Sequence, residues 1–174
     1  LDGGMPSKGP HALADVAEFR KDVMLASYLK AGFKEKPTLY SDYRKLLEHE
    51  GLDAVIIATP DHHHKPVLLA AMDAGKHAYC EKPLSHTIED GKEMVAAAQK
   101  SGKVIQVGTQ NRSNTLYQRA KEMVAAGMIG DITYVRAFWY RYSRDDNPAW
   151  RSLIPPDANP HNPDCKKCLG GRAS

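Results

Sequence analysis

The sequence predicts an α/β fold built on a doubly wound parallel sheet. Three observations carry this prediction. Apolar, strand-like runs alternate with helix-like runs through most of the chain, a glycine follows each helix-like run, and the strand-like run at residues 54–58 has no polar interruption. Alternation of strand and helix predicts βαβ units with parallel strands. An unbroken apolar strand is typical of a parallel sheet that is covered on both faces.

The expected elements follow one another with short connections. Residues 1–10 are rich in glycine and proline and are expected to form a loop. The strands are expected over residues 11–16, 38–40, 53–59, 76–80 and 103–108. The helices are expected over residues 17–31, 42–50, 61–74, 88–100 and 115–126. The glycine after each helix suits a helix end, where the backbone often turns to positive φ.

Two helix starts and several buried helix faces can be predicted in more detail. Ser41 is expected to cap the second helix, and Thr87, with Asp90 three residues later, is expected to cap the fourth. The spacing of apolar residues predicts which side chains face the core. These are Phe19, Val23, Ala26 and Leu29 or Lys30 in the first helix, Leu46 and Leu47 in the second, and Val67, Leu68, Ala71 and Met72 in the third.

The pattern changes near residues 111–115. Residues 131–142 form a long aromatic run of alternating polarity, which predicts a half-covered strand in a different sheet. Residues 145–174 are rich in proline, asparagine and aspartate and predict no element. We therefore expect a first domain over residues 1–112 and the beginning of a second α/β domain over residues 113–174.

The composition is that of a soluble globular protein, with 42% hydrophobic and 26% charged residues in 174. The net charge of +3 is small and the two signs are mixed along the helices, so no nucleic-acid partner is expected. No apolar run approaches the roughly 18 residues of a membrane span, so no membrane partner is expected. Three cysteines make no disulfide framework and fit a reducing compartment. We expect a cytoplasmic protein, and an exported form stays open because a leader could have been removed.

Three successive strands end in polar residues that can contact a ligand. The polar segments are residues 59–64, 81–83 and 109–112. Because the carboxyl ends of parallel strands meet at one edge of a sheet, a binding crevice is expected along that edge. The run His62, His63 and His64 does not predict a metal site, because adjacent side chains at a helix start point in different directions and no matching carboxylate or cysteine cluster accompanies them.

These segments resemble the Gfo/Idh/MocA family of nicotinamide-dependent oxidoreductases. The matching text lies at residues 40–47, 53–64, 74–84 and 106–112, and its most specific phrase is Gly-Lys-His-x-x-x-Glu-Lys-Pro at residues 75–83. The resemblance implies a Rossmann domain followed by an open-sheet α/β domain that holds the substrate. It also implies NAD in preference to NADP, a small carbohydrate or polyol substrate, and a homo-oligomer.

The resemblance implies cofactor contacts at Asp15, Thr59, Pro60, His64 and Gln110, and also at Glu81 and Lys82. Asp15 is similar to the acid that accepts hydrogen bonds from the adenosine ribose, with a helix cap as the alternative. Thr59 and Pro60 are similar to residues that bend the backbone beneath the dinucleotide, although Pro60 also ends the strand. His64 resembles a histidine beside the nicotinamide. Gln110 is expected to line the same crevice.

The resemblance also implies a catalytic role for Lys82. Its ammonium group would hydrogen-bond the substrate hydroxyl and lower the pKa of that hydroxyl as hydride leaves for the cofactor. Glu81 would position the cofactor or the lysine, and Pro83 would fix the turn. The alternative for Glu81 and Lys82 is an ordinary surface pair at a strand end. Arg112 is expected in the crevice or in an interdomain ion pair.

The chain departs from the family pattern at both ends. A G-x-G-x-x-G turn is expected about 20 residues before the ribose acid, but Gly3 and Gly4 stand only a short loop before Asp15. The strand that is expected with that turn would link the two halves of the sheet. The second-domain histidine that serves as general acid/base in relatives has no counterpart. Cys165 and Cys168 lie in a segment that resembles one with aromatic residues at these two positions, so two substitutions are the favoured interpretation and a redox or zinc half-site is the alternative.

Three functional hypotheses follow from these matches and departures. The first is an NAD-dependent oxidoreductase that acts on a sugar, inositol or related polyol. The second is a glycoside hydrolase that uses a bound nicotinamide in a transient oxidation. The third is a non-catalytic fragment or remnant of such an enzyme.

Overall fold

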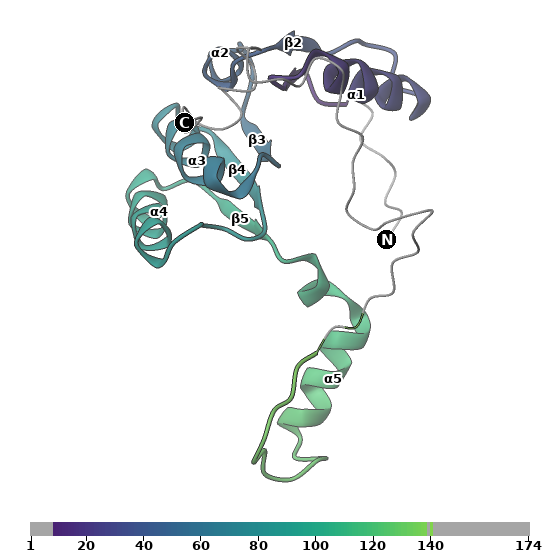
Figure 1. The fold of residues 1–174 in the computed structure, drawn as a ribbon, viewed down its shortest axis with the longest axis vertical. Helices are drawn as coiled ribbons and strands as arrows, with labels where there is room; N and C mark the ends of the chain where they lie inside the picture. Colours follow the sequence, from purple (N-terminus) through teal and green to yellow (C-terminus); the bar gives the residue numbers. More distant parts are fainter. Residues whose placement is uncertain (1–8, 139, 141–174) are drawn as a thin grey trace. The chain divides into compact units, whose positions relative to one another are not determined.

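The computed structural model describes residues 9–138 and Tyr140 (Figure 1). These residues fall into two compact units, one that ends at Gly108 and one that begins at Thr109. Among the described residues, no helix combines enough length with enough apolar character to cross a bilayer. The predicted domain ranges 1–112 and 113–174 stay predictions, because most of the second range lies outside the described residues.

The first unit begins with a small parallel sheet. Strand β1 pairs with β2 in register, so that Leu13 lies opposite Leu39. Two helices accompany this sheet, and α2 contacts both of its strands. The elements are β1 (Ala12–Ala14), α1 (Glu18–Lys30), β2 (Thr38–Tyr40) and α2 (Tyr43–Leu47).

A three-stranded parallel sheet forms the rest of the first unit. Strand β4 lies between β3 and β5, and Ile56, Tyr79 and Gln106 stand in one row across the three strands. Figure 1 shows this sheet with α3 and α4 beside it. The elements are β3 (Ala54–Ile57), a 3-10 turn η1 (Asp61–His63), α3 (His64–Asp73), β4 (His77–Glu81), α4 (Ile88–Ser101) and β5 (Ile105–Gly108).

The predicted α/β fold with parallel strands is confirmed, but the strands form two sheets. Among the described residues, β1 pairs with β2 and β3 pairs with β4, and no ladder joins β1 to β3. In a Rossmann sheet the first strand stands between the second and the fourth. If β1 and β2 are counted as the second and third strands, and β3 as the fourth, the break falls at the place of the central first strand.

The core lies where the three-stranded sheet, α3 and α4 meet. It contains Ile57, Val67, Leu68, Met72, Ala78, Cys80 and Met94. Helix α3 packs against β3 and β4 and contacts α4. The prediction for the third helix is confirmed, because all four of its expected core residues are buried.

The expectation that residues 53–59 are covered on both faces is wrong for the described structure. Ile57 is 2% exposed, whereas the neighbouring Ile56 is 80% exposed. Side chains alternate between the two faces of a strand, and α3 packs on the face that carries Ile57. The apolar run at residues 54–58 therefore has one face covered by α3 and one apolar face that is exposed in the described part of the chain.

The predicted inner face of the first helix is also wrong. Phe19, Val23 and Leu29 are exposed, whereas Lys21 and Tyr28 are buried. The Tyr28 ring stacks on Phe33, with 4.6 Å between the ring centroids, and it also covers Gly9 so closely that a β-carbon would not fit there. The Lys21 ammonium group donates to Ser41 Oγ at 2.8 Å and pairs with Glu18. These contacts with segments outside the helix, which its own periodicity does not reveal, select its inner face.

One of the two predicted helix caps is confirmed. Thr87 Oγ1 accepts a hydrogen bond from the Asp90 backbone N–H at 3.1 Å, and α4 ends at Gly102, which has φ of 63°. The cap of α2 is Asp42 and not Ser41. The Asp42 carboxylate accepts from the Arg44 N–H at 2.9 Å. The helix begins one residue later than predicted, so Asp42 is the residue with extended backbone before it.

The second unit contains a 3-10 turn η2 (Gln110–Ser113) and helix α5 (Thr115–Ala125). Asn114 caps α5 by accepting from the Leu116 N–H at 2.9 Å. The helix predicted over residues 115–126 is thus confirmed to within one residue.

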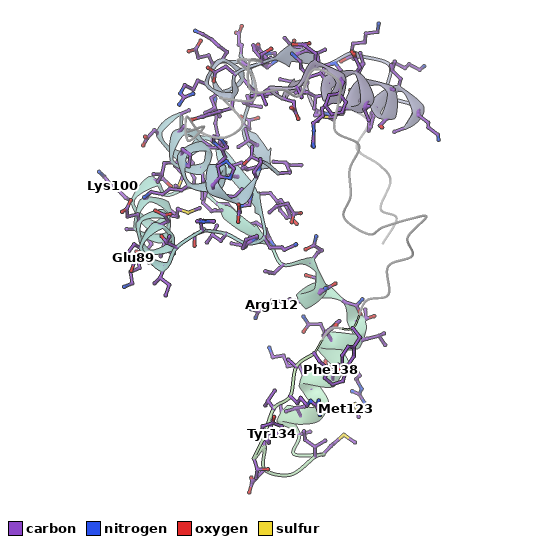
Figure 2. All side chains as sticks on the ribbon, in the orientation of Figure 1. Glu89, Lys100, Arg112, Met123, Tyr134 and Phe138 are labelled. Atoms are coloured by element: carbon purple, nitrogen blue, oxygen red, sulfur yellow. The ribbon has the colours of Figure 1, made fainter. Side chains whose placement is uncertain are left out.

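The predicted strand over residues 131–142 is not found in its described part, residues 131–138 and 140. The side chains of Ile132, Tyr134, Val135 and Phe138 are exposed there, and Figure 2 shows Tyr134 and Phe138 in this segment after α5. An alternating sequence forms a strand only beside a partner strand, and the described residues of this unit supply none. Cys165 and Cys168 lie outside the described residues.

Candidate functional site

The first part of the candidate site is the corner after β3. Thr59 and Pro60 are exposed there, and the Pro60 carbonyl accepts a hydrogen bond from the His63 N–H at 2.8 Å. Asp61 Oδ1 accepts from the His62 N–H, also at 2.8 Å. These short-range bonds form the 3-10 turn that leads into α3 and leave Thr59 and Pro60 at the surface.

The second part is the loop after β4. Glu81 ends the strand, and its Oε2 accepts from the Lys82 N–H at 3.1 Å. Lys82 and Pro83 are exposed, and the peptide bond between them is cis. Gly108 of β5 lies against the Glu81 carboxyl group, and a β-carbon at that glycine would come within 3.0 Å of it. Because Gly108 has no β-carbon, the neighbouring strand leaves room for the Glu81 side chain.

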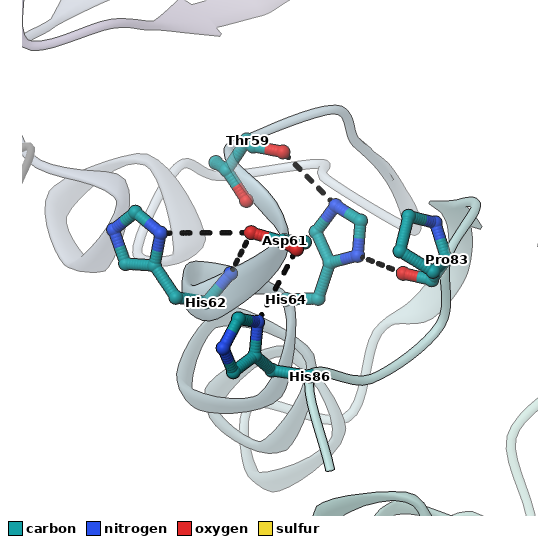
Figure 3. A network of polar contacts seen from close by, with 6 residues as sticks. All are labelled: Thr59, Asp61, His62, His64, Pro83 and His86. Atoms are coloured by element: carbon teal, nitrogen blue, oxygen red, sulfur yellow. Dashed lines mark hydrogen bonds and ion pairs between the residues drawn. The ribbon is translucent and has the colours of Figure 1, made fainter.

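The buried residue His64 connects these two parts. Its Nδ1 lies 2.7 Å from the Pro83 carbonyl oxygen, and its Nε2 lies 2.9 Å from the Thr59 carbonyl oxygen (Figure 3). The residue is 1% exposed. One imidazole therefore bridges the backbone after β3 and the backbone after β4.

A second connection joins the same loops at the surface. His86 Nδ1 lies 3.2 Å from Asp61 Oδ2, and His62 Nδ1 lies 3.7 Å from Asp61 Oδ1 (Figure 3). The hydrogen bond from His86, followed by the one from the His62 backbone, lowers the pKa of the Asp61 carboxyl below its ordinary value. No local sequence pattern predicts this pair, because Asp61 and His86 stand 25 positions apart in the chain.

The Asp61 pair predicts a dependence of stability on acid. Because the pKa of Asp61 is lowered from 3.8 in the folded protein, its contribution to stability is present above pH 3.8 and is lost as the pH falls through the folded pKa. We expect wild type to be more stable than Asp61→Asn at neutral pH, and the two to converge in acid. Urea unfolding of both proteins between neutral pH and about pH 2 measures this.

The matched variant for that experiment is Asp73→Asn, at the exposed carboxyl end of α3. It removes a carboxylate that has no side-chain contact among the described residues. The Asp61 interpretation fails if Asp61→Asn and Asp73→Asn follow the same course with pH.

Cys80 precedes Glu81 on β4 and points into the core, where it is fully buried. Burial, with a smaller effect from the Glu81 charge, raises the pKa of its thiol to about 11. The thiol is therefore protonated at neutral pH and supplies no nucleophile beside the site. The titratable groups that this strand presents at its end are Glu81 and Lys82.

Asp15 follows β1, as predicted. Its Oδ1 accepts from the Ala17 N–H at 2.8 Å, and its own N–H donates to the Tyr40 carbonyl at 3.2 Å. One carboxylate oxygen is thus used at the start of α1, and the other has no protein partner in the described structure. Ala17, and not Asp15, is the N-cap of α1, so the helix-cap alternative for Asp15 is wrong, and the ribose contact stays a prediction.

The structure brings together only some of the predicted site residues. Thr59, Pro60 and His64 meet the Lys82 loop at the carboxyl ends of β3 and β4. Asp15 belongs to the other sheet. Gln110 and Arg112 belong to η2 in the second unit, so their place in a shared crevice stays a prediction. Within the described ranges, no three His, Cys, Asp or Glu side chains gather as a metal site would require.

Comparison with known proteins identifies the family. The family model described as "Oxidoreductase family, NAD-binding Rossmann fold" (Gfo/Idh/MocA) matches residues 21–109, just over half of the chain. Levoglucosan dehydrogenase of Pseudarthrobacter phenanthrenivorans is 32% identical over 139 residues, which are 78% of this chain and 35% of that protein. Inositol 2-dehydrogenase of Salmonella typhimurium is 34% identical over 105 residues, 60% of this chain and 31% of that protein.

Solved structures give the same result. Apo scyllo-inositol dehydrogenase of Lactobacillus casei matches with a TM-score of 0.61 and 28% identity, over 71% of this chain and 35% of that one. Levoglucosan dehydrogenase in complex with NADH and levoglucosan matches with a TM-score of 0.57 and 30% identity, over 70% of this chain and 31% of that one. The chain spans about a third of the length of these relatives. It belongs to the Gfo/Idh/MocA oxidoreductase family, and the matched region is that family's NAD-binding Rossmann domain.

Proposed function

We propose that the complete protein transfers a hydride between NAD and a hydroxyl or keto group of a sugar, inositol or related polyol. The observation that carries the proposal is Lys82. Its side chain is exposed directly after β4, at the edge where parallel strands end, and in the described part of the chain its ammonium group has no acidic partner. An unpaired ammonium group at this edge is available to a substrate oxygen.

The residues present suit a dinucleotide at this edge. Asp15 has one carboxylate oxygen left for a ribose hydroxyl, and its negative charge disfavours the extra phosphate of NADP. The exposed residues Thr59 and Pro60 offer a surface beneath the dinucleotide. The relatives whose names include NADH or inositol support both NAD and a polyol.

In the proposed mechanism NAD supplies the hydride acceptor. Lys82 donates a hydrogen bond to the substrate oxygen, which lowers the pKa of that hydroxyl and stabilises the negative charge as its proton leaves. Glu81 holds the Lys82 backbone through the bond from the Lys82 N–H to Oε2. When bound, NAD would accept the hydride of the substrate carbon and the proton of the hydroxyl would pass to water, so that the alcohol becomes a carbonyl.

We further propose that the complete protein contains the phosphate-binding turn and a substrate domain beyond the matched region. The break between the two sheets and the one-third coverage of relatives support this. A homo-oligomer and a cytoplasmic location stay predictions. The non-catalytic alternative applies to any form of the protein that lacks those parts.

The test is a titration of the full-length protein with NADH, followed by fluorescence, and then an assay of NAD reduction with inositol and simple sugars. We expect saturable NADH binding in the micromolar to millimolar range that is usual for substrates and cofactors. Absence of saturable binding contradicts the cofactor. Release of a free sugar from a glycoside, without net NADH, assigns the hydrolase alternative instead.

A further inference from the structure

The contacts of His64 connect two loops, which is more than a buried polar side chain needs to satisfy its own nitrogens. Both of its ring nitrogens face backbone carbonyls, at 2.7 Å from Pro83 O and 2.9 Å from Thr59 O. Carbonyls only accept hydrogen bonds, so each contact needs a hydrogen on the ring nitrogen. A neutral ring carries one such hydrogen and makes one of the two bonds, and the shorter distance, to Pro83 O, favours a hydrogen on Nδ1. At 1% exposure, no water can replace either partner without opening the core.

The shorter of the two contacts lies one residue from the candidate catalytic lysine. The Lys82 backbone is held on one side by the bond from its N–H to Glu81 Oε2, at 3.1 Å. It is held on the other side by the bond between His64 and the Pro83 carbonyl. The Lys82 side chain is exposed. The chain is therefore held at the Lys82 N–H and at the carbonyl of the next residue, while the Lys82 ammonium group stays available.

We propose that His64 is a positioning residue, which acts through the Pro83 carbonyl to fix Lys82 relative to the corner at Thr59. This inference rests on the proposed function for the part that concerns Lys82 in catalysis. It gives His64 a different task from a direct contact with the nicotinamide, because both ring nitrogens face protein carbonyls. Small displacements of a reacting group cost large factors in rate, so such a bond has a measurable effect.

Two substitutions separate positioning from packing. The amide nitrogen of asparagine falls near the position of Nδ1, and that of glutamine falls near Nε2. His64→Asn can thus keep the bond to Pro83, whereas His64→Gln can keep only the bond to Thr59. Glutamine is the closer match in volume, so a packing role favours His64→Gln. A positioning role favours His64→Asn.

The experiment measures kcat and KM of the full-length protein with saturating NAD, and the backbone amide signals of Lys82 and Leu84 by NMR. We expect His64→Gln to lose about tenfold to a hundredfold in kcat and to shift both amides, with KM and NADH affinity near wild type. We expect His64→Asn to stay within about threefold of wild type in kcat. The control is His11→Asn, an exposed histidine before β1.

The proposal is overturned if His64→Gln retains kcat and amide positions as well as or better than His64→Asn. If both variants unfold, NMR of the His64 ring in the wild-type protein still tests the proposal. A slowly exchanging Nδ1–H of His64, with a cross-peak to Pro83, supports the proposal, and an Nδ1 without hydrogen contradicts it. If wild type neither binds NADH nor turns over a polyol, the proposed function fails, and the amide shifts alone then decide the positioning role.

Discussion

Replacing Lys82 with methionine is expected to lower kcat by about 10²–10⁴-fold, the usual contribution of a positioned acid/base group. Methionine keeps an unbranched chain of similar reach but has no hydrogen to donate to the substrate oxygen. Because Lys82 is exposed and has no ion pair in the described structure, the free energy of unfolding should change by no more than about 0.5 kcal/mol. Steady-state kinetics with saturating NAD and urea unfolding measure the two quantities.

The matched control for Lys82 is Lys100→Met. Lys100 is an exposed lysine in the last turn of α4, which leads to the start of β5 and so lies at the opposite end of the strands (Figure 2). It should leave kcat unchanged. A Lys82→Met protein with wild-type kcat, or an equal loss in both variants, would remove the catalytic assignment.

Ile57→Ala and Ile56→Ala are expected to differ strongly although the two residues are adjacent. Ile57 is 2% exposed in the core under α3, so its truncation should cost about 2–5 kcal/mol of unfolding free energy. Ile56 is 80% exposed, and its truncation should cost no more than about 0.5 kcal/mol. Equilibrium unfolding in urea compares the two under identical conditions.

The outcome of this pair also reports on the open face of the sheet. Equal losses in both variants would contradict the exposure of Ile56 and would mean that another segment of the complete protein covers that face. A loss confined to Ile57 would mean that one covered face is enough for β3.

Local signals were the ones that sequence alone predicted well. The Thr87 cap needs only a side-chain oxygen and a backbone N–H that stand three residues apart in the chain. The buried face of α3 follows from its 3.6-residue periodicity, because the helix packs along that whole face. The parallel direction of the strands follows from the alternation of strand and helix.

Predictions that depended on distant partners were less successful. Lys21 is buried in place of Phe19 because the Lys21 ammonium group donates a hydrogen bond to Ser41, twenty residues further along the chain. The alternation over residues 131–142 indicates a strand only if a partner strand exists, and the described residues have none. In the candidate site, the sequence phrase at residues 75–83 was enough to predict Lys82 as the catalytic residue. The bridge through His64 and the pair of Asp61 with His86 required the three-dimensional contacts.

Because of the break between the two sheets, strand edges in the described part of the chain carry backbone groups without ladder partners. On the sides of β1 and β3 that have no ladder among the described residues, N–H and C=O groups are available to any extended segment. Such edges do not discriminate strongly by side chain, because the bonds are made by the main chain. Any form of the protein in which these edges stay unpaired should therefore tend to associate by adding strands.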